Sequence, residues 1–413
     1  MANEWLDFAL GDLCSLITDG KHGDCLDEPE SGFYFLSVKD VVGNRLVYDR
    51  ARQIAERDFA ETHRRTNLEP GDVLFTNTGT IGRMAIAKND PKTYRTTFQK
   101  SVAILKPKRD VIDPHFLYYL LQFDNAKLSE FAAGTTQKNL LLKDLRSFVA
   151  HVPPICEQRA IAQILRSLDD KIELNRQMNE TLEGIARALF RFWFVDPIAS
   201  GLPKEWRVGR LRDCCERVEN GGTPKRNEPS YWRPKEIPWL TSGEVRQAIV
   251  TKTNNFISQE GLANSSAKLW GHATTVVALY GATAGQVCFI GNEMCANQAC
   301  CGLVPKLDMR YYVYLHASSS VGALELQARG SAQQNLSQQI VAEFPVIIPD
   351  PDTLRRFDNA VHPVFKKWLA NIEESSTIGE LRDALLPKLL SGQLRLEISR
   401  SDSTPIITRD GRL

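Results

Sequence analysis

Three stretches of the sequence carry residue types that could do chemistry, and each departs from the motif that such chemistry needs. Residues 134–138 (GTTQK) lack the second glycine of a phosphate-binding GxxxxGK[ST] loop. Residues 196–199 (DPIA) fail at the last two places of the Asn/Asp-Pro-Pro-aromatic motif that holds a flipped adenine. Asp350 with Glu373 or Glu374 suggests nuclease acids, but no lysine follows at the required spacing. We therefore expect no catalytic residues in this chain.

Histidines and cysteines do not combine into a metal site. The seven histidines contain no HExxH pair, and the nine cysteines lack CxxC spacing. Two adjacent pairs, Cys214/Cys215 and Cys300/Cys301, are among them. We expect buried free thiols and no bound metal.

The longest helical pattern spans residues 153–197. Its apolar residues follow the four-and-three spacing of a heptad, and Asn175 and Asn179 occupy polar places in the same stripe. Such a helix is roughly 50–60 Å long, so it requires a partner helix. The residues expected in this seam are Ile161, Leu165, Leu168, Ile172, Asn175, Leu182 and Leu189.

A second long helix is predicted over residues 349–396, and it repeats the first at an offset of 196 residues. Pro153 corresponds to Pro349, and Asn175 corresponds to Asn371. The repeat favours pairing of the two helices over an ordinary amphipathic helix on a core, and the two asparagines would fix the register. The expected seam residues of this helix are Trp368, Asn371, Ile378 and Leu385.

Two globular regions, rich in short strand-like runs, precede the two helices. Residues 1–152 form the first, and residues 198–348, including a leading linker, form the second. The run VLFTNTGTIGRMAIA recurs as VVALYGATAGQVCFI, and the GTTQKNL loop at 134–140 recurs as GSAQQNL at 330–336. We also expect a short helix over 114–121, a strand over 145–152 and a polar tail over 397–413. The fold class is α+β, with two long antiparallel coiled-coil helices and an internal pseudo-two-fold repeat.

Composition limits the possible functions. A chain of 413 residues with 43% hydrophobic content can bury two or three cores, and its net charge is only +1. A protein that grips DNA alone usually carries a basic excess, so near-neutrality argues against DNA or for partners that share the duplex. No stretch has the length of a membrane helix, so we expect a cytoplasmic protein.

The order of these motifs resembles that of the specificity subunits of type I restriction-modification systems. The resemblance rests on the glycine-containing runs at 78–82 and 281–285, the loops at 134–140 and 330–336, the PPxxEQxxIA opening at 153–162 and the FxxWFVDP…GLPxxW junction. One departure is the opening of the second helix, which lacks the Glu-Gln of the first. The match covers almost the whole chain.

The resemblance implies that each globular region is a target recognition domain that reads one half of a bipartite double-stranded DNA target. The helices would set the spacer between the halves. The partners would be two methyltransferase (modification) subunits and two restriction/translocase subunits, which would use S-adenosylmethionine, ATP and Mg. The specificity subunit itself would bind no cofactor and perform no chemistry.

Base edges are read by Arg and Lys at guanine and by Asn and Gln at adenine, while Lys, Ser and Thr also contact phosphates. The candidates in the first region are Lys21, Lys39, Thr78, Thr80, Arg83, Arg95, Gln99 and Lys100. The candidates in the second are Lys225, Arg226, Arg233, Lys235, Ser242, Arg246, Tyr280 and Gln298. Any one of them can instead be a solvated surface charge or a loop-capping residue. The alternative functions are a coiled-coil interaction scaffold without a nucleic-acid role and a stand-alone DNA-modifying enzyme.

Overall fold

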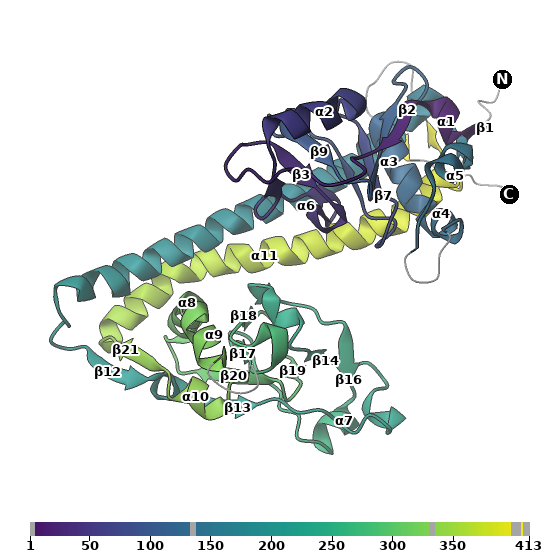
Figure 1. The fold of residues 1–413 in the computed structure, drawn as a ribbon. Helices are drawn as coiled ribbons and strands as arrows, with labels where there is room; N and C mark the ends of the chain where they lie inside the picture. The colour runs from purple at the N-terminus through teal and green to yellow at the C-terminus, as the bar shows by residue number, and fades with distance from the viewer. Residues whose placement is uncertain (1–4, 133–137, 330–334, 398–405, 408–413) are drawn as a thin grey trace. The chain divides into compact units, whose positions relative to one another are not determined.

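The computed structural model describes residues 5–132, 138–329, 335–397 and 406–407 (Figure 1). The chain divides into two units, residues 1–171 with 378–413 and residues 172–377. Each unit contains one globular part and a segment of each of two long helices, α6 (Ile155–Phe190) and α11 (Pro351–Leu390). The predicted α+β class, with two β-rich globular parts and two long helices, is confirmed.

The globular part of the first unit is built on a four-stranded antiparallel sheet of order β2-β10-β7-β8 and a three-stranded sheet of order β6-β3-β9. A further pair, β1-β11, leads into α6, and β4 pairs with β5. The strands are β1 (Leu6–Ala9), β2 (Cys14–Asp19), β3 (Tyr34–Leu36), β4 (Val41–Val42), β5 (Arg45–Leu46), β6 (Arg52–Gln53), β7 (Val73–Thr76), β8 (Met84–Ile86), β9 (Thr96–Phe98), β10 (Val102–Pro107) and β11 (Val149–Val152). The helices are α1 (Leu10–Leu13), α2 (Glu56–Thr66), α3 (Pro114–Phe123), α4 (Asn125–Glu130) and α5 (Leu142–Ser147).

The second unit has a five-stranded sheet of order β13-β20-β17-β18-β15, a three-stranded sheet of order β16-β14-β19 and the pair β12-β21. Its strands are β12 (Arg207–Arg210), β13 (Cys215–Asn220), β14 (Ile237–Leu240), β15 (Ile249–Val250), β16 (Asn255–Ile257), β17 (Thr275–Ala278), β18 (Val287–Ile290), β19 (Cys295–Ala296), β20 (Cys300–Pro305) and β21 (Pro345–Ile348). Its helices are α7 (Gln259–Ala263), α8 (Arg310–Ser319), α9 (Val321–Arg329) and α10 (Gln338–Ala342). The short strands β22 (Leu396–Glu397) and β23 (Ile406–Ile407) belong to the first unit.

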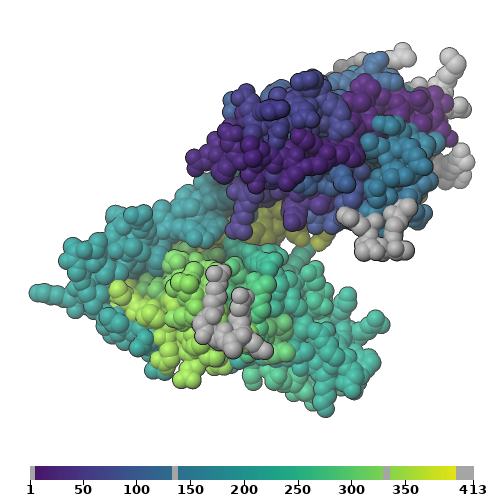
Figure 2. All heavy atoms as spheres, viewed as in Figure 1, coloured from purple at the N-terminus to yellow at the C-terminus, as the bar shows by residue number. Residues whose placement is uncertain are grey.

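The two globular parts repeat one topology. In the first, β3 pairs parallel with β9 and antiparallel with β6. In the second, β14 pairs parallel with β19 and antiparallel with β16. The four-stranded order β2-β10-β7-β8 corresponds in the same way to β13-β20-β17-β18. The internal repeat that the sequence predicts is therefore a repeat of strand order and direction. Figure 2 shows the heavy atoms of both globular parts in the view of Figure 1.

In the first unit, α6 and α11 run antiparallel and pack on the globular core. Ile161 and Leu165 of α6 lie fully buried in one apolar cluster with Leu389 and Leu390 of α11. Further along, Asp169 accepts hydrogen bonds from Tyr119 Oη at 2.7 Å and from Arg382 Nη1 at 2.6 Å. Apolar burial and this polar contact together fix both helices to α3.

The same antiparallel pairing occurs within the second unit. Phe190 of α6 and Phe357 of α11 lie 6.3 Å apart between ring centroids, in a cluster that also holds Phe194, Phe365 and Trp368. Asn175 and Asn371 are completely buried at equivalent positions of the two helices. Nδ2 of Asn175 donates to the Asn371 carbonyl at 3.4 Å, so the asparagines lie in the predicted seam.

The remaining seam residues are less enclosed. Leu182 and Leu189 pack against the second unit's cluster, and Leu385 packs against that of the first, each partly buried. Leu168, Ile172 and Ile378 are also half-buried. These apolar seam residues therefore keep part of their surface exposed, unlike the fully buried Asn175 and Asn371.

The helix bounds differ from the predicted ones for local reasons. Regular α6 ends at Phe190, not at 197, and continues as a π turn over Arg191–Val195 and a 3-10 turn over Asp196–Ser200. Pro197 falls in the first turn of this 3-10 segment, a position that tolerates the missing N–H of proline. Helix α11 ends at Leu390, not at 396, because Gly392 adopts a positive φ of 72° and reverses the chain.

Four smaller predictions have different outcomes in the structure. The short helix predicted over 114–121 is present as α3. The strand predicted over 145–152 begins only at Val149, because Leu142–Ser147 is helical and buries Leu145. Eight cysteines are buried free thiols as expected, but Cys156 is exposed because it lies on the outer face of the first turn of α6. Most of the tail predicted over 397–413 lies outside the described residues.

Candidate nucleic-acid interface

Several candidates in the first unit meet where β2 and β9 end. Lys21 follows β2, Gln99 and Lys100 follow β9, and the backbones of Lys21 and Gln99 form a parallel bridge. Lys100 N donates to Lys21 O at 3.1 Å. This approach depends on Gly20, because a Cβ there would lie 1.9 Å from the Phe98 carbonyl oxygen. The structure therefore gathers these three polar residues at one end of the sheet.

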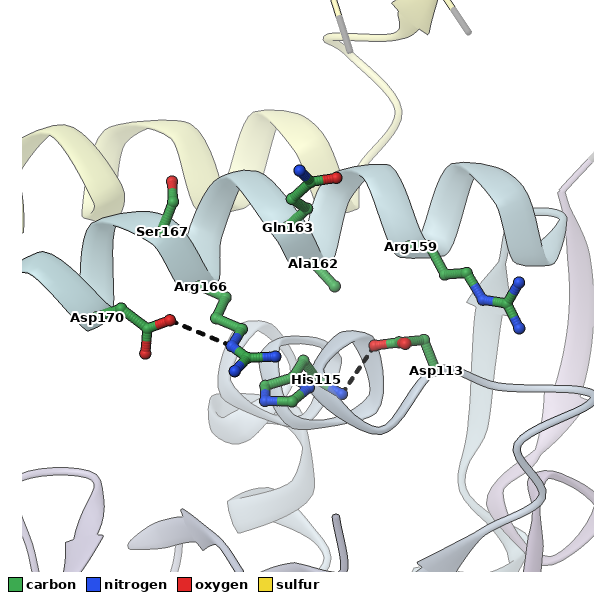
Figure 3. Close-up of a pocket in the computed structure, with 8 residues that line it drawn as sticks. All are labelled: Asp113, His115, Arg159, Ala162, Gln163, Arg166, Ser167 and Asp170. Carbon is green, nitrogen blue, oxygen red and sulfur yellow. Dashed lines mark hydrogen bonds and ion pairs between the residues drawn. The ribbon is translucent and has the colours of Figure 1, made fainter. Parts of the chain in front are cut away.

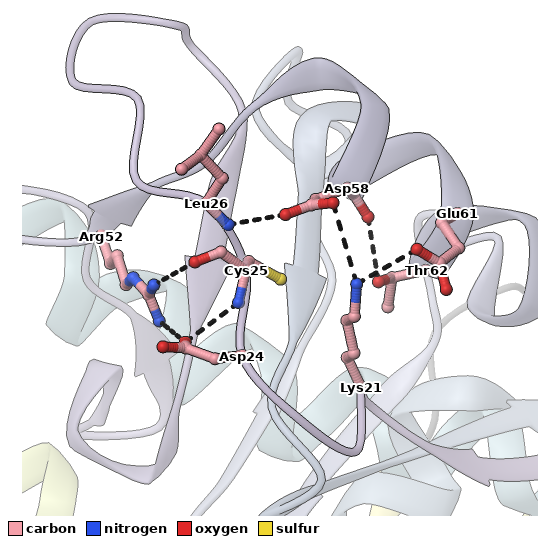
Figure 4. Close-up of polar contacts among 8 residues, drawn as sticks. All are labelled: Lys21, Asp24, Cys25, Leu26, Arg52, Asp58, Glu61 and Thr62. Carbon is pink, nitrogen blue, oxygen red and sulfur yellow. Dashed lines mark hydrogen bonds and ion pairs between the residues drawn. The ribbon is translucent and has the colours of Figure 1, made fainter.

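Lys21 itself is held inside the unit. Its ammonium donates to Glu61 at 3.2 Å and lies 3.9 Å from Asp58, both on α2 (Figure 4). Arg52 in the same region bonds the Cys25 carbonyl at 2.5 Å and the carboxylate of Asp24. An ammonium satisfied by two carboxylates has little left to offer a phosphate. Lys100 is exposed and remains the better positioned cation of the group.

Thr78 and Tyr280 occupy equivalent places in the two units. Each forms an isolated antiparallel bridge, Thr78 with Asn139 and Tyr280 with Asn335. Thr78 Oγ1 also donates to Asn139 Oδ1 at 2.8 Å. The glycine-containing turn and the loop that ends in Asn-Leu (Asn139-Leu140 or Asn335-Leu336, here called the NL loop) are far apart in sequence. These bridges bring them together in each unit. Residues 134–137 and 330–334 of those loops lie outside the described residues.

The other candidates of the first unit are divided between two places. Arg83 donates to the Val38 carbonyl at 3.2 Å, which brings it beside the exposed Lys39, and Thr80 is exposed in the same glycine-containing turn as Thr78. Arg95 instead precedes β9 and lies over the Phe33 ring at 5.6 Å. Because Gln99 follows the other end of β9, the structure does not bring Arg95 to the Lys21–Gln99 group.

In the second unit, Arg226 is fixed between two aromatic rings. Its guanidinium carbon lies 4.5 Å from the ring centroid of Trp232 and 5.1 Å from that of Trp239. The indole N–H of Trp232 donates to the Lys225 carbonyl at 3.0 Å, and that of Trp239 donates to Gly222 O at 3.0 Å. The rings are therefore anchored to the loop that carries Arg226. An exposed guanidinium held in this way keeps its planar donors free for a ligand.

The remaining candidates of this unit surround the ends of β14 and β19. Gln298 accepts a hydrogen bond from Thr223, and Asn297 N donates to Leu240 O at 2.9 Å, which places Gln298 beside the segment that holds Ser242 and Arg246. Lys235 lies 6.0 Å from the Phe256 ring. Lys225, Arg233 and Arg246 are exposed.

Sequence reasoning missed three partners of these candidates. Trp239 was not singled out because a buried tryptophan in a strand is usually core, and its role as support for Arg226 depends on contacts across 13 residues of sequence. Asn139 and Asn335 stood in recognised loops but were not named as site residues. Their only signal in the sequence is recurrence in both NL loops.

The root of α6 uses the Glu-Gln pair of its opening motif internally. Gln158 donates from Nε2 to the carbonyls of Pro153 at 2.8 Å and Val111 at 3.1 Å, and its Oε1 accepts from Asp113 N at 2.9 Å. Burial raises the pKa of Glu157, while Arg395 opposes that shift. In the second unit Asp350 caps α11 instead, accepting from Thr353 N at 2.9 Å.

The part of the chain that the structure describes holds no group of three or more His, Cys, Asp or Glu side chains arranged to bind a metal ion. Among the same residues, no helix combines the length and the apolar character that crossing a membrane requires.

A protein-family model described as the type I restriction modification DNA specificity domain matches residues 2–184 and again residues 203–359. These two matches cover most of the chain and fall on its two repeats. The chain belongs to this family. The type I restriction enzyme MjaIX specificity subunit of Methanocaldococcus jannaschii is 27% identical over 384 residues, covering 88% of this chain and 87% of that protein. The HindI specificity subunit of Haemophilus influenzae is 23% identical, covering 95% of this chain and all of that protein.

The fold is also shared with a solved specificity subunit. The type I restriction-modification S subunit from M. genitalium superposes with a TM-score of 0.60 at 16% sequence identity, covering 97% of this chain and 98% of that one. At this identity the likeness concerns the fold alone. It supports the two-repeat architecture of this type I specificity chain.

Proposed function

We propose that this chain reads a bipartite sequence in double-stranded DNA, one half-site with each globular part. The observation that carries the proposal is the combination of a shared framework with different polar residues at equivalent points. Thr78 stands where the second unit has Tyr280, and both pair with the asparagine of an NL loop. Because base edges are distinguished by the donors and acceptors presented to them, two such sets would recognise different half-sites.

The paired helices would set the distance between the half-sites and dock two methyltransferase subunits. In the first unit Leu381 is an exposed apolar side chain of α11, and in the second Leu174 and Ile185 are exposed on α6. Phe192, in the π turn after α6, is also exposed. Apolar side chains on the outer faces of helices support docking of another protein.

In this proposal the chain performs no chemistry of its own. Methyltransferase subunits would bind S-adenosylmethionine and flip the target adenines, and two restriction subunits would use ATP and Mg. The absence of complete catalytic motifs from the sequence supports this division of labour. The net charge of +1 supports it as well, because partners would supply much of the contact with phosphates.

The test is genome-wide adenine methylation in cells that carry this chain with its modification subunit, compared with cells that lack only this chain. We expect a split motif that disappears when the chain is removed. Its two constant parts would be the half-sites, and the unspecified bases between them would be the spacer. An unchanged methylome, with the modification subunit shown to be active, would contradict the proposal.

A further inference from the structure

The internal repeat allows the contacts of the two helix roots to be compared position by position. In the second unit, the first turn of α8 faces α11 through Arg310, whose Nε and Nη2 donate to the two carboxylate oxygens of Asp358 at 3.1 and 2.8 Å. Asp358 is only 5% exposed. One turn further, Tyr311 Oη and His362 Nδ1 lie 2.8 Å apart. A two-pronged ion pair thus fills this place in the second unit.

At the equivalent place in the first unit, the carboxylate is missing. The offset of 196 residues puts Ala162 of α6 where α11 has Asp358, and puts Arg166 where α11 has His362. The same offset puts Pro114 of α3 where α8 has Arg310, and His115 where α8 has Tyr311, so the arginine that pairs with Asp358 has no counterpart either. A hollow of about 290 Å³ lies here, lined by Asp113, His115, Arg159, Ala162, Gln163, Arg166, Ser167 and Asp170 (Figure 3).

The hollow has more hydrogen-bond donors than acceptors. Arg166 donates from Nε to Asp170 at 3.2 Å, which uses one of its five N–H groups. Arg159 is exposed and makes no ion pair with any residue that the structure describes. The carboxylate of Asp113 is turned to the helix end, where Oδ1 accepts from His115 N at 2.9 Å and Phe116 N at 3.1 Å. The guanidinium groups of Arg159 and Arg166 therefore border a space that holds no counterpart of Asp358.

We propose that this hollow receives a carboxylate side chain of the modification subunit. That carboxylate occupies the place equivalent to the one that Asp358 occupies in the second unit. The inference rests on the proposed function, because it names the contact by which one methyltransferase subunit docks. An arginine guanidinium binds a carboxylate better than a lysine ammonium does, because its planar fork of N–H donors reaches both carboxylate oxygens. The occupant is therefore an Asp or Glu side chain.

The electrostatic state of His115 fits this role. Burial lowers the pKa of its imidazole, Arg166 lowers it further, and Asp113 and Asp170 act in the opposite direction. The ring is therefore neutral near pH 7 in the free chain, so the cationic groups that line the hollow are those of Arg159 and Arg166. A carboxylate that entered the hollow would have both guanidinium groups as partners.

The experiment supplies the missing acid from within. The full-length variant Ala162→Asp places a carboxylate at the position of Asp358, and Ala126→Asp makes the same change at an exposed site on α4 of the same unit. Each chain is co-expressed with the modification subunit, and native mass spectrometry counts the subunits bound. We expect two modification subunits on the wild type and on Ala126→Asp, and one on Ala162→Asp.

A second variant tests the same contact in case Ala162→Asp does not fold. Arg159→Glu changes an exposed side chain and reverses its charge, so it should weaken the same contact at least tenfold while the chain stays folded. If Ala162→Asp and Arg159→Glu both bind two subunits as tightly as the wild type, the inference is overturned. A wild-type chain that binds no modification subunit would overturn the proposed function together with the inference.

Discussion

Asn175 and Asn371 make reciprocal hydrogen bonds across the paired helices of the second unit. Nδ2 of Asn175 donates to Ser375 Oγ at 3.2 Å, and Nδ2 of Asn371 donates to Asn179 Oδ1 at 2.9 Å. Ser375 lies four residues after Asn371, and Asn179 lies four residues after Asn175, so the two contacts are equivalent in the two helices. A shift of one helix along the other would leave both buried amides without these partners. The pair therefore selects one register.

Replacing Asn371 by alanine should lower the free energy of unfolding by about 1–3 kcal/mol, because a buried hydrogen bond is lost and a space is left behind. Denaturant unfolding followed by helical circular dichroism measures the change. Gln177→Ala is the matched control, since Gln177 is exposed on α6 and its side chain donates to Glu173 of the same helix. Its effect should stay within about 0.5 kcal/mol. Equal losses in the two variants would contradict a register role for Asn371.

Glu157 gives a prediction about pH. Burial raises its folded pKa above the ordinary glutamate value, so the folded state holds the proton to higher pH than the unfolded chain does. Wild-type stability should therefore fall as pH rises from the ordinary pKa through the folded one. Glu157→Gln carries no such charge and should gain stability relative to the wild type as pH rises above the ordinary pKa of glutamate. Thermal melts at several pH values test this.

The control for that series is Glu130→Gln, which alters an exposed glutamate at the end of α4. Its melting temperature should follow the wild type at every pH. If the Glu157→Gln and wild-type curves stayed parallel across the range, burial of Glu157 would not be the cause of any pH dependence.

Arg226 should contribute to the half-site read by the second unit. Arg226→Ala removes a guanidinium held against Trp232 and Trp239, and a lost bidentate base contact costs about 1–3 kcal/mol of discrimination. Methylome sequencing should show one base relaxed in one half-site and the other half-site unchanged. Arg212→Ala is the control, because Arg212 is already paired with Glu343. Relaxation in both half-sites, or in neither, would count against this assignment.

Much of the fold was predictable because the sequence contains an internal repeat of the same order of elements. The offset that relates Asn175 to Asn371 identified the seam, and the buried pair confirms that the helices meet there. The end of α11 was less predictable, since it depends on the single residue Gly392. The strand expected from Leu145 began late because its apolar residues are equally suited to a buried helical turn.

The candidate site was harder to predict because the composition of a surface does not reveal its internal partners. Lys21 reads in the sequence as a free cation, but two acids of α2, about 40 residues later, neutralise it. Arg226 gave the opposite result. Its exposed guanidinium is held by the rings of Trp232 and Trp239, which lie further along the sequence. In the same way, the hollow at Ala162 is visible only when its contacts are compared with those of Asp358.

The central claim is that the paired helices set the distance between two half-sites. Three heptads inserted after Lys171 in α6 and after Thr377 in α11, at the boundary between the units, leave the Asn175–Asn371 pair intact. Each helix would lengthen by about 32 Å, close to one turn of DNA at roughly 34–36 Å, so the half-sites would face the same side. One inserted heptad, about 10 Å, would place them on different faces and serves as the control.

The decisive measurement is therefore the adenine methylome of cells carrying the three-heptad variant. We predict the same two half-sites separated by about 9 additional base pairs, at roughly 3.4 Å each, and weak methylation with the single heptad. Methylation at the original spacing by the three-heptad variant would contradict the account.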